Sequence, residues 1–133
     1  MFNLSIVTPE KIFYEDEVAS LIAPGIEGYL GILTDHAPLI TAITPGKVTV
    51  KDNSQEEIIL SVTNGFLEVS ANTATLLVDA VEYASEIDAD RAKEALERAR
   101  KRMADEAGNI DIPRARKAID RAKNRIKIAS GDR

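Results

Sequence analysis

The chain contains no cysteine, and only 5% of its 133 residues are aromatic. Without cysteine the protein has neither a disulfide framework nor a thiolate metal site, and this composition suits a reducing compartment. No apolar run approaches the roughly 20 residues that span a bilayer, and the N-terminus lacks the cationic and apolar regions of a secretory signal. We therefore expect no direct membrane insertion, so that a partner protein has to provide any association with a membrane.

Basic residues are scarce in the first part of the chain. Residues 1–84 carry 3 Lys and Arg against 12 Asp and Glu, whereas residues 85–133 carry 14 against 10. The overall net charge of −5 argues against nucleic acid as the main ligand, because a phosphate backbone attracts positive surface. Nucleic-acid binding by the basic second part is disfavoured too, because no aromatic residue lies among its arginines to stack on bases. The change in charge divides the chain into two predicted units, 1–84 and 85–133.

The first unit has the period-2 pattern of β-strands. Phe2, Leu4 and Ile6 alternate with polar residues, and Pro9 closes this first strand. Turn residues bound each of the further strands, which are predicted at residues 18–23, 47–51, 57–62, 66–69 and 73–78. Short strands with no helical pattern between them predict an antiparallel β-sandwich or flattened barrel.

Asn64-Gly65 is the strongest turn signal in this unit. The dipeptide tolerates positive φ at both positions of a tight hairpin turn. It therefore predicts that the strands at 57–62 and 66–69 pair with each other as neighbours.

After Ser85 the apolar period changes to 3.6, which predicts α-helices. Asp88 is well placed as the N-cap of a first helix, and Gly108-Asn109 supplies its end. The apolar stripe of this helix consists of Ala92, Ala95, Leu96, Ala99 and Met103.

A second helix follows at once. Asp111 is its predicted N-cap, Pro113 suits its first turn, and the helix is expected to end near Gly131. Its apolar stripe consists of Ala115, Ala118, Ile119, Ala122 and Ile126. The short connection predicts that the two helices form an antiparallel hairpin. Because the stripes are mostly alanine, the hairpin buries little apolar area, and we expect it to need the sandwich, another protein or a ligand for stability.

Two motifs that resemble catalytic sites lack the necessary partners. Residues 44–48 contain the Gly-Lys of a phosphate loop, but Val48 replaces the hydroxyl residue that holds magnesium, so this segment is interpreted as a turn into a strand. His36 is the only histidine, and no nucleophile motif accompanies it. A loop histidine is the favoured interpretation, and a small enzyme centred on His36 is the alternative.

The glycine-rich segment 28–33 does not have the strand-loop-helix context of a phosphate cradle. It is interpreted as a bend or bulge where two backbones approach closely. An exposed loop that contacts a partner, with Tyr29 as the projecting group, is compatible with this interpretation.

Four arginines of the second unit share helix faces in pairs. Arg91 and Arg98 are seven residues apart, and Arg121 and Arg125 are four apart. If the two faces converge, they form an anion pocket, with Asp88 and Glu82 as acceptors for a base or ribose. By themselves, however, the residues favour a solvated face with i,i+4 ion pairs such as Glu94–Arg98.

The chain resembles the epsilon subunits of the bacterial F-type ATP synthase along essentially its full length. The resemblance is carried by Val7-Thr8-Pro9, by residues 28–39, by residues 64–69 and by residues 86–92. Thr34 and Asn64 depart from the residues usual in the family, proline and glycine, but both suit turns.

The resemblance implies a ten-stranded β-sandwich followed by a helical hairpin, in a non-catalytic rotor subunit of the central stalk. It implies that the sandwich docks on the gamma subunit and the c-ring at the cytoplasmic face of the bacterial plasma membrane, helping to couple proton flow to rotation. The segment expected to face the c-ring comprises Glu27, Gly28, Tyr29, Leu30, Gly31 and Ile32. The extended hairpin is expected to meet the alpha and beta subunits and to block hydrolysis, whereas the folded hairpin permits turnover.

The resemblance also implies ATP as a regulatory ligand, with no required cofactor, no metal site and no catalytic residue. The family motif Ile/Leu-Asp-x-x-Arg-Ala matches residues 87–92 here. The implied ATP-binding residues are Glu82, Ile87, Asp88, Arg91, Arg98, Arg121 and Arg125. This match shifts the preference from a solvated face to a nucleotide site. A free-standing nucleotide-binding module without a rotary partner is the alternative function.

Overall fold

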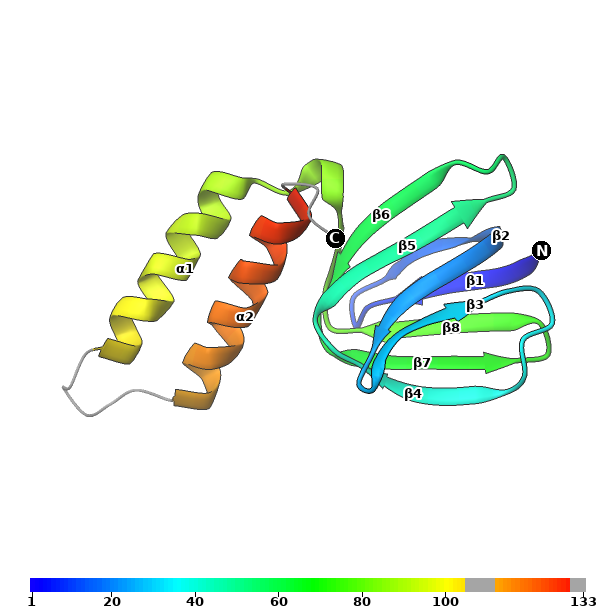
Figure 1. Ribbon diagram of the computed structural model, residues 1–133, viewed down its shortest axis with the longest axis horizontal. Helices are drawn as coiled ribbons and strands as arrows, with labels where there is room; N and C mark the ends of the chain where they lie inside the picture. Colours follow the sequence, from blue (N-terminus) through cyan, green and yellow to red (C-terminus); the bar gives the residue numbers. More distant parts are fainter. Residues whose placement is uncertain (105–111, 130–133) are drawn as a thin grey trace. The chain divides into compact units, whose positions relative to one another are not determined.

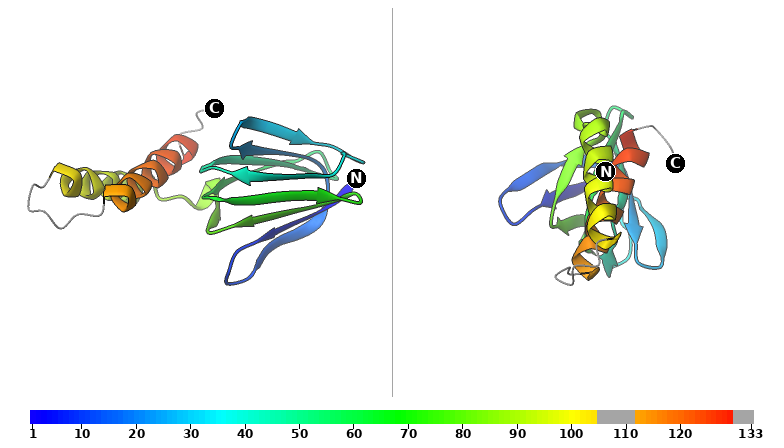
Figure 2. Two further views of the ribbon diagram at one scale, coloured as in Figure 1. Left: turned by 90° about the horizontal axis from the view of Figure 1, so that it is seen from below. Right: turned by 90° about the vertical axis from the view of Figure 1, so that its left-hand side faces the viewer.

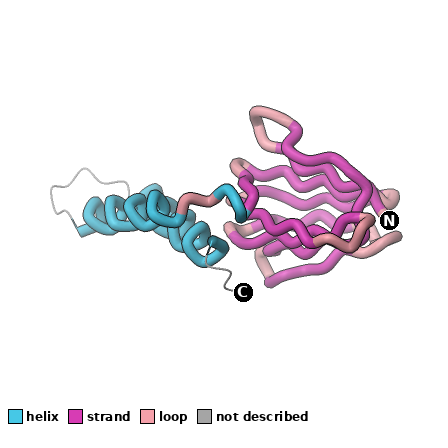
Figure 3. Tube along the Cα trace, turned by 90° about the horizontal axis from the view of Figure 1, so that it is seen from above, coloured by secondary structure: helices cyan, strands magenta, loops and turns pink. Residues whose placement is uncertain are grey.

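The computed structural model describes residues 1–104 and 112–129 of the chain (Figure 1). It divides into two compact units, Met1–Tyr83 and Ala84–Arg133. Figure 3 shows that the first unit is built from strands and the second from helices. The predicted caps and ends at Gly108-Asn109, Asp111 and Gly131 lie outside the described residues.

The first unit is the predicted β-sandwich, with nine strands in one folded sheet. The strands are β1 (Phe2–Val7), β2 (Ile12–Gly25), β3 (Gly28–Ile32), β4 (Leu39–Ile43), β5 (Gly46–Asp52), β6 (Glu57–Val62), β7 (Gly65–Ser70), β8 (Thr73–Val78) and β9 (Val81–Tyr83). Their order is β1-β8-β7-β4-β2-β5-β6-β9, with β3 paired to β2. All pairs are antiparallel except β1 with β8, which is parallel.

Strand β2 belongs to both layers of the sandwich (Figure 2). Its first half pairs with β1 up to Val18, and its second half pairs with β5 and β3. The register with β5 shifts between Val18 and Ser20, so Ala19 forms an irregularity in the strand. Val18 and Leu21 are therefore both buried although they are three residues apart, and Ala23 continues the buried row after Leu21. The structure therefore has nine strands rather than ten, because this 14-residue strand is continuous across both layers.

The core lies between the two layers and follows the alternation that the sequence predicts. Leu4 and Ile6 of β1 are fully buried, as are Leu67 of β7 and Leu76 of β8. Val48 of β5 comes from the opposite layer and belongs to the same apolar cluster. Burying such side chains contributes about 1.5–3 kcal/mol each, and this supplies most of the stability of the unit.

The predicted hairpin turn at Asn64-Gly65 is wrong. Strand β6 pairs with β5 and β9, whereas β7 pairs with β4 and β8, so the chain passes between layers here. Neither residue has positive φ. Gly65 is needed for another reason: a Cβ would overlap the carbonyl oxygen of Leu77 and lie 2.7 Å from the Cα of Val78. Close approach of two backbones therefore explains this glycine.

A tight two-residue turn with positive φ does occur, but at Ala71 and Asn72. Their φ angles are 49° and 57°, and Ser70 pairs with Thr73 across the turn between β7 and β8. Two consecutive left-handed residues are the signature of a type I′ hairpin turn. Alanine is an unusual residue for such a position, so the sequence alone did not indicate this turn.

The second unit contains η1 (Ala84–Glu86), α1 (Ala89–Ala104) and α2 (Ile112–Ala129). The two helices run antiparallel beside each other, as predicted (Figure 1). Asp88 is the N-cap of α1, because its Oδ1 accepts the Arg91 backbone N–H at 3.1 Å. Alanines form most of the buried seam, namely Ala92, Ala99, Ala115 and Ala122.

Candidate functional site

An arginine-alanine repeat defines one face of the helical unit. Ala92 and Ala99 of α1 are buried, and each directly follows an exposed arginine, Arg91 and Arg98. Helix α2 repeats this arrangement, with exposed Arg121 before buried Ala122. Because a residue one position before the seam is rotated about 100° from it, each arginine flanks the seam on the same side of its helix.

The two arginine flanks lie on the same side of the helical pair. In an antiparallel pair, the positions that precede the seam residue on each helix face each other across one side of the interface. Arg91 and Arg98 of α1 therefore share a face with Arg121 of α2, and Arg125, one turn after Arg121, extends it. Arg125 is half-buried, and the other three side chains are exposed. The predicted convergence of the two arginine pairs on one face is consistent with the backbone geometry.

One further arginine on this face was missed by the sequence prediction. Arg114 directly precedes buried Ala115, in the same relation as Arg121 to Ala122 seven residues later. The recurring Arg-Ala dipeptide was the signal that would have found it. We define the arginine face as Arg91, Arg98, Arg114, Arg121 and Arg125.

The electrostatics of the arginine face favour an anion. Positive charges gathered on one helix face attract anions, with Arg121 and Arg125 one turn apart and Arg91 and Arg98 two turns apart. The ion pair expected for a merely solvated face, Glu94–Arg98, is not formed between these two described side chains. Glu97 pairs instead with Arg100 at 3.5 Å, on the opposite flank of α1. That exposed pair contributes little stability.

Asp88 and Asp90 place two negative charges at the N-terminus of α1. The Asp88 carboxylate already accepts a first-turn N–H, and Asp90 adds a second negative charge there. These carboxylates take the place that an anion would otherwise occupy at a helix N-terminus. The N-terminus of α1 is therefore already capped by negative charge.

The other two predicted ATP-binding residues precede α1. Ile87 is half-buried in the link between η1 and α1, where its N–H donates to the Ala84 carbonyl at 3.3 Å. Glu82 lies in β9, in register with Ser61 of β6, and so belongs to the sandwich unit. The helical unit therefore contains six of the seven predicted ATP-binding residues, and Glu82 is in the other unit.

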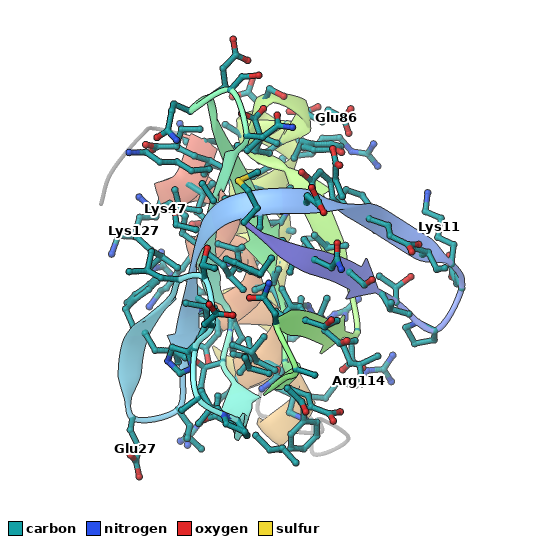
Figure 4. The ribbon with its side chains drawn as sticks, turned by 90° about the vertical axis from the view of Figure 1, so that its right-hand side faces the viewer. Lys11, Glu27, Lys47, Glu86, Arg114 and Lys127 are labelled. Atoms are coloured by element: carbon teal, nitrogen blue, oxygen red, sulfur yellow. The ribbon has the colours of Figure 1, made fainter. Side chains whose placement is uncertain are left out.

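The segment expected to face a partner is a β-hairpin, not a loop or bulge. Strand β3 pairs with the end of β2 from Leu21–Ile32 to Gly25–Gly28, and Ile26 and Glu27 form the turn. Gly28 has a φ of +127°, which only glycine adopts readily. Figure 4 shows Glu27 pointing outward at the tip of this hairpin, while Lys11 lies at the separate tip of the β1–β2 hairpin.

Tyr29 is not simply a projecting group. Its side chain is 61% exposed, but its hydroxyl accepts the Lys47 backbone N–H at 3.2 Å. The ring therefore lies over the sandwich and joins β3 to the start of β5. The other side of the hairpin is held by backbone bonds from Ile26 to Ala42 and from Thr44 to Pro24.

The sandwich also carries an apolar groove that the sequence prediction missed. Ala42, Phe66, Leu77 and Val7 are cross-strand neighbours on the outer face of β4, β7, β8 and β1. Phe66 is 58% exposed and Leu77 is 45% exposed, and the groove measures about 530 Å³. An outward row of apolar residues breaks the usual alternation and makes this groove a candidate protein-contact surface. Phe66 at an outward position of β7 was the available sequence signal.

His36 lies in the loop between β3 and β4, where its Nδ1 is 2.7 Å from the Ala37 carbonyl oxygen. This agrees with the interpretation as a loop histidine. Within residues 1–104 and 112–129, no three His, Asp or Glu side chains group as they would around a metal ion. No helix in this described part is both long and apolar enough for a membrane span.

The fold and the two surfaces define a class of protein in which a β-sandwich with an exposed apolar groove is joined to a cationic helical hairpin. The family model of the ATP synthase delta/epsilon chain β-sandwich domain matches residues 1–84, and that of its long α-helix domain matches residues 85–130. The chain belongs to this ATP synthase delta/epsilon family, whose members are non-catalytic subunits.

Similar proteins agree with this assignment. The ATP synthase epsilon chain of Moorella thermoacetica is 46% identical over 101 residues, which cover 76% of this chain and 75% of that protein. The epsilon chain of Protochlamydia amoebophila is 41% identical over 103 residues, covering 77% of this chain and 70% of that protein.

Two solved structures share the fold. A chain of the Euglena gracilis mitochondrial ATP synthase, in an OSCP/F1/c-ring structure, has a TM-score of 0.80 at 20% identity, covering 91% of this chain and 76% of its own. A chain of the Tetrahymena thermophila mitochondrial ATP synthase central stalk and c-ring has a TM-score of 0.61 at 19% identity, covering 97% of this chain and 93% of its own.

Proposed function

We propose that this chain is a rotor subunit of a proton-translocating ATP synthase, in which its sandwich couples the gamma subunit to the c-ring. Family membership and the central-stalk setting of the Tetrahymena structure support this role. The observation that carries it is the in-register apolar row Ala42, Phe66, Leu77 and Val7 on an otherwise acidic sandwich. The assembled complex then holds the chain peripherally at the cytoplasmic face of the membrane.

A binding experiment with the gamma subunit tests the groove. Phe66→Ala with Leu77→Ala removes the two largest exposed side chains of the row, and we expect at least a tenfold loss of affinity for gamma, because central apolar anchors dominate interfaces. Ile12→Ala is the matched control, since Ile12 is 60% exposed but is not part of the groove. Equal affinity of the double variant and the wild type would refute docking at the groove.

The proposal includes a regulatory function of the helical hairpin. The arginine face binds the phosphates of ATP in the folded hairpin, and the extended hairpin blocks hydrolysis by placing its basic side chains against the alpha and beta subunits. The alanine seam supports this, because a weakly packed hairpin changes state at low cost. A ligand at 100 times its dissociation constant stabilises the form that binds it by about 2.7 kcal/mol, enough to shift such an equilibrium.

Isothermal titration tests ATP binding. We expect Arg91→Ala and Arg125→Ala to weaken ATP binding to the full chain, each by tenfold or more, because each removes a charge-assisted hydrogen-bond donor. Lys93→Ala is the control for α1 and Lys123→Ala the control for α2, since the helical period places both away from the arginine face. Absence of ATP binding by the wild type, or equal loss in the lysine variants, would remove the sensing proposal.

The inhibitory part is tested in the assembled enzyme. We expect hydrolysis to rise with ATP concentration as ATP favours the folded hairpin, and the Arg91→Ala complex to stay inhibited at concentrations that relieve the wild type. The Lys93→Ala complex is expected to behave like the wild type. Identical ATP dependence of the Arg91→Ala and wild-type complexes would show that the arginine face does not control inhibition.

A further inference from the structure

Tyr29 occupies the place where the β2–β5 ladder stops. The last pair of that ladder is Ile22 with Thr49, two residues from Lys47. Beyond it the pairing with β5 stops, although β2 continues to Gly25. The Tyr29 hydroxyl accepts the Lys47 N–H at 3.2 Å. A side-chain oxygen is therefore the acceptor at a position beyond the last β2–β5 backbone pair.

Gly46 allows the backbones around this contact to approach each other closely. A Cβ on Gly46 would lie 2.7 Å from the Pro24 Cβ and 3.1 Å from the Tyr29 hydroxyl oxygen. Glycine at the start of β5 therefore lets the end of β2 and the tyrosine lie against it. The hairpin is consequently held on two sides: by backbone bonds to β4 and by Tyr29 to β5.

We infer that Tyr29 is a positioning residue, whose hydroxyl holds the β2–β3 hairpin so that its tip presents Ile26 and Glu27 to the c-ring in one orientation. The inference rests on the proposed rotor function, because it concerns the segment that the proposed c-ring contact uses. Its physical basis is pre-organisation: a hairpin already held in the bound orientation loses less conformational freedom on binding. Tyr29 then acts on the ring contact through the hairpin, not through its own exposed ring.

The test compares two substitutions in the full chain. Tyr29→Phe keeps the ring and removes the hydroxyl, and Tyr29→Ala removes both. We expect Tyr29→Phe to speed hydrogen exchange of the Lys47 amide about fivefold, the change that loss of one neutral hydrogen bond gives. Affinity for purified c-ring in nanodiscs is expected to fall by about two- to fivefold, because a smaller fraction of the hairpin is in the binding orientation. Tyr14→Phe removes a hydroxyl elsewhere in the sandwich and serves as the control.

The outcomes separate the two proposals. Unchanged Lys47 exchange in Tyr29→Phe overturns the inference, because the hydroxyl then does not hold β5. Ring affinity of Tyr29→Phe equal to the wild type, with a loss only in Tyr29→Ala, also overturns it and makes Tyr29 a direct contact. If the wild-type chain itself does not bind the ring, the proposed ring contact fails and the positioning role fails with it.

Discussion

Asn72 and Asp35 are 37 residues apart in the sequence, yet the Asn72 Oδ1 accepts the Asp35 backbone N–H at 2.8 Å. The Asn72 Nδ2 donates to the Met1 carbonyl oxygen at 2.9 Å. One side chain in the β7–β8 turn therefore joins the N-terminus to the loop between β3 and β4. Both Asn72 and Asp35 have positive φ, so the contact links two left-handed positions.

Replacing Asn72 by glycine tests this link. Asn72→Gly keeps the freedom to adopt positive φ but removes both side-chain hydrogen bonds. We expect the free energy of unfolding to fall by about 1–2 kcal/mol, since each bond contributes roughly 0.5–1.5 kcal/mol. Urea denaturation of the full chain, followed by a signal from the sandwich, measures the change.

Ala71→Gly is the matched control in the same turn. Ala71 has a φ of 49°, and a left-handed alanine costs about 1–2 kcal/mol, part of which glycine recovers after its larger loss of chain entropy. The expected result is an unchanged or slightly higher stability. A loss as large as that of Asn72→Gly would mean that the turn, and not the Asn72 side chain, is responsible.

A second prediction concerns Gly65, where the chain passes between layers. Gly65→Ala places a Cβ against the Leu77 carbonyl and 2.7 Å from the Val78 Cα, which forces β7 and β8 apart. We expect at least about 2 kcal/mol of destabilisation in urea denaturation, in the range of severe packing defects. Gly31→Ala is the control, because its Cβ meets nothing within 4 Å, and it is expected to change stability by less than about 0.5 kcal/mol.

The third prediction concerns the Asp88 cap. Asp88→Ala removes the acceptor of the Arg91 N–H and should destabilise α1 by about 1 kcal/mol, whereas Asp88→Asn retains an acceptor and should lose much less. Hydrogen exchange of the first-turn amides of α1 measures the effect. Equal exchange in the alanine and asparagine variants would contradict a capping role.

The fourth prediction is a pH dependence that originates from Tyr14. Burial raises the Tyr14 pKa above its ordinary value of 10.0, and the charges of Asp16 and Asp52 raise it further. The folded state therefore holds this proton more tightly than the unfolded state does. The resulting stability is fully present below the unfolded-state pKa and is lost as pH rises through the folded-state pKa.

Denaturation series from about pH 9 to about pH 12 measure this loss, because this range brackets the ordinary tyrosine pKa. Tyr14→Phe is expected to unfold with a shallower dependence on pH across this range, because its side chain does not ionise. Identical slopes for the variant and the wild type would show that Tyr14 does not contribute.

The sequence by itself determined the features that depend on local periodicity and chemistry. Alternating apolar residues set β1, turn residues bounded the strands at 57–62 and 73–78, the change of period after Ser85 set the helices, and Asp88 capped α1 as its side chain predicts. The arginine pairs could be placed on helix faces for the same reason, since a helix repeats at a fixed angle.

Tertiary structure alone decided which strands pair and what the turns do. Asn64-Gly65 suits a hairpin locally, but burying β6 and β7 in opposite layers stabilises the fold more than a local turn does. The Tyr29–Lys47 contact and the row of Phe66 and Leu77 likewise join residues distant in the sequence. Such contacts depend on the summed burial of the whole core, which no short stretch of sequence contains.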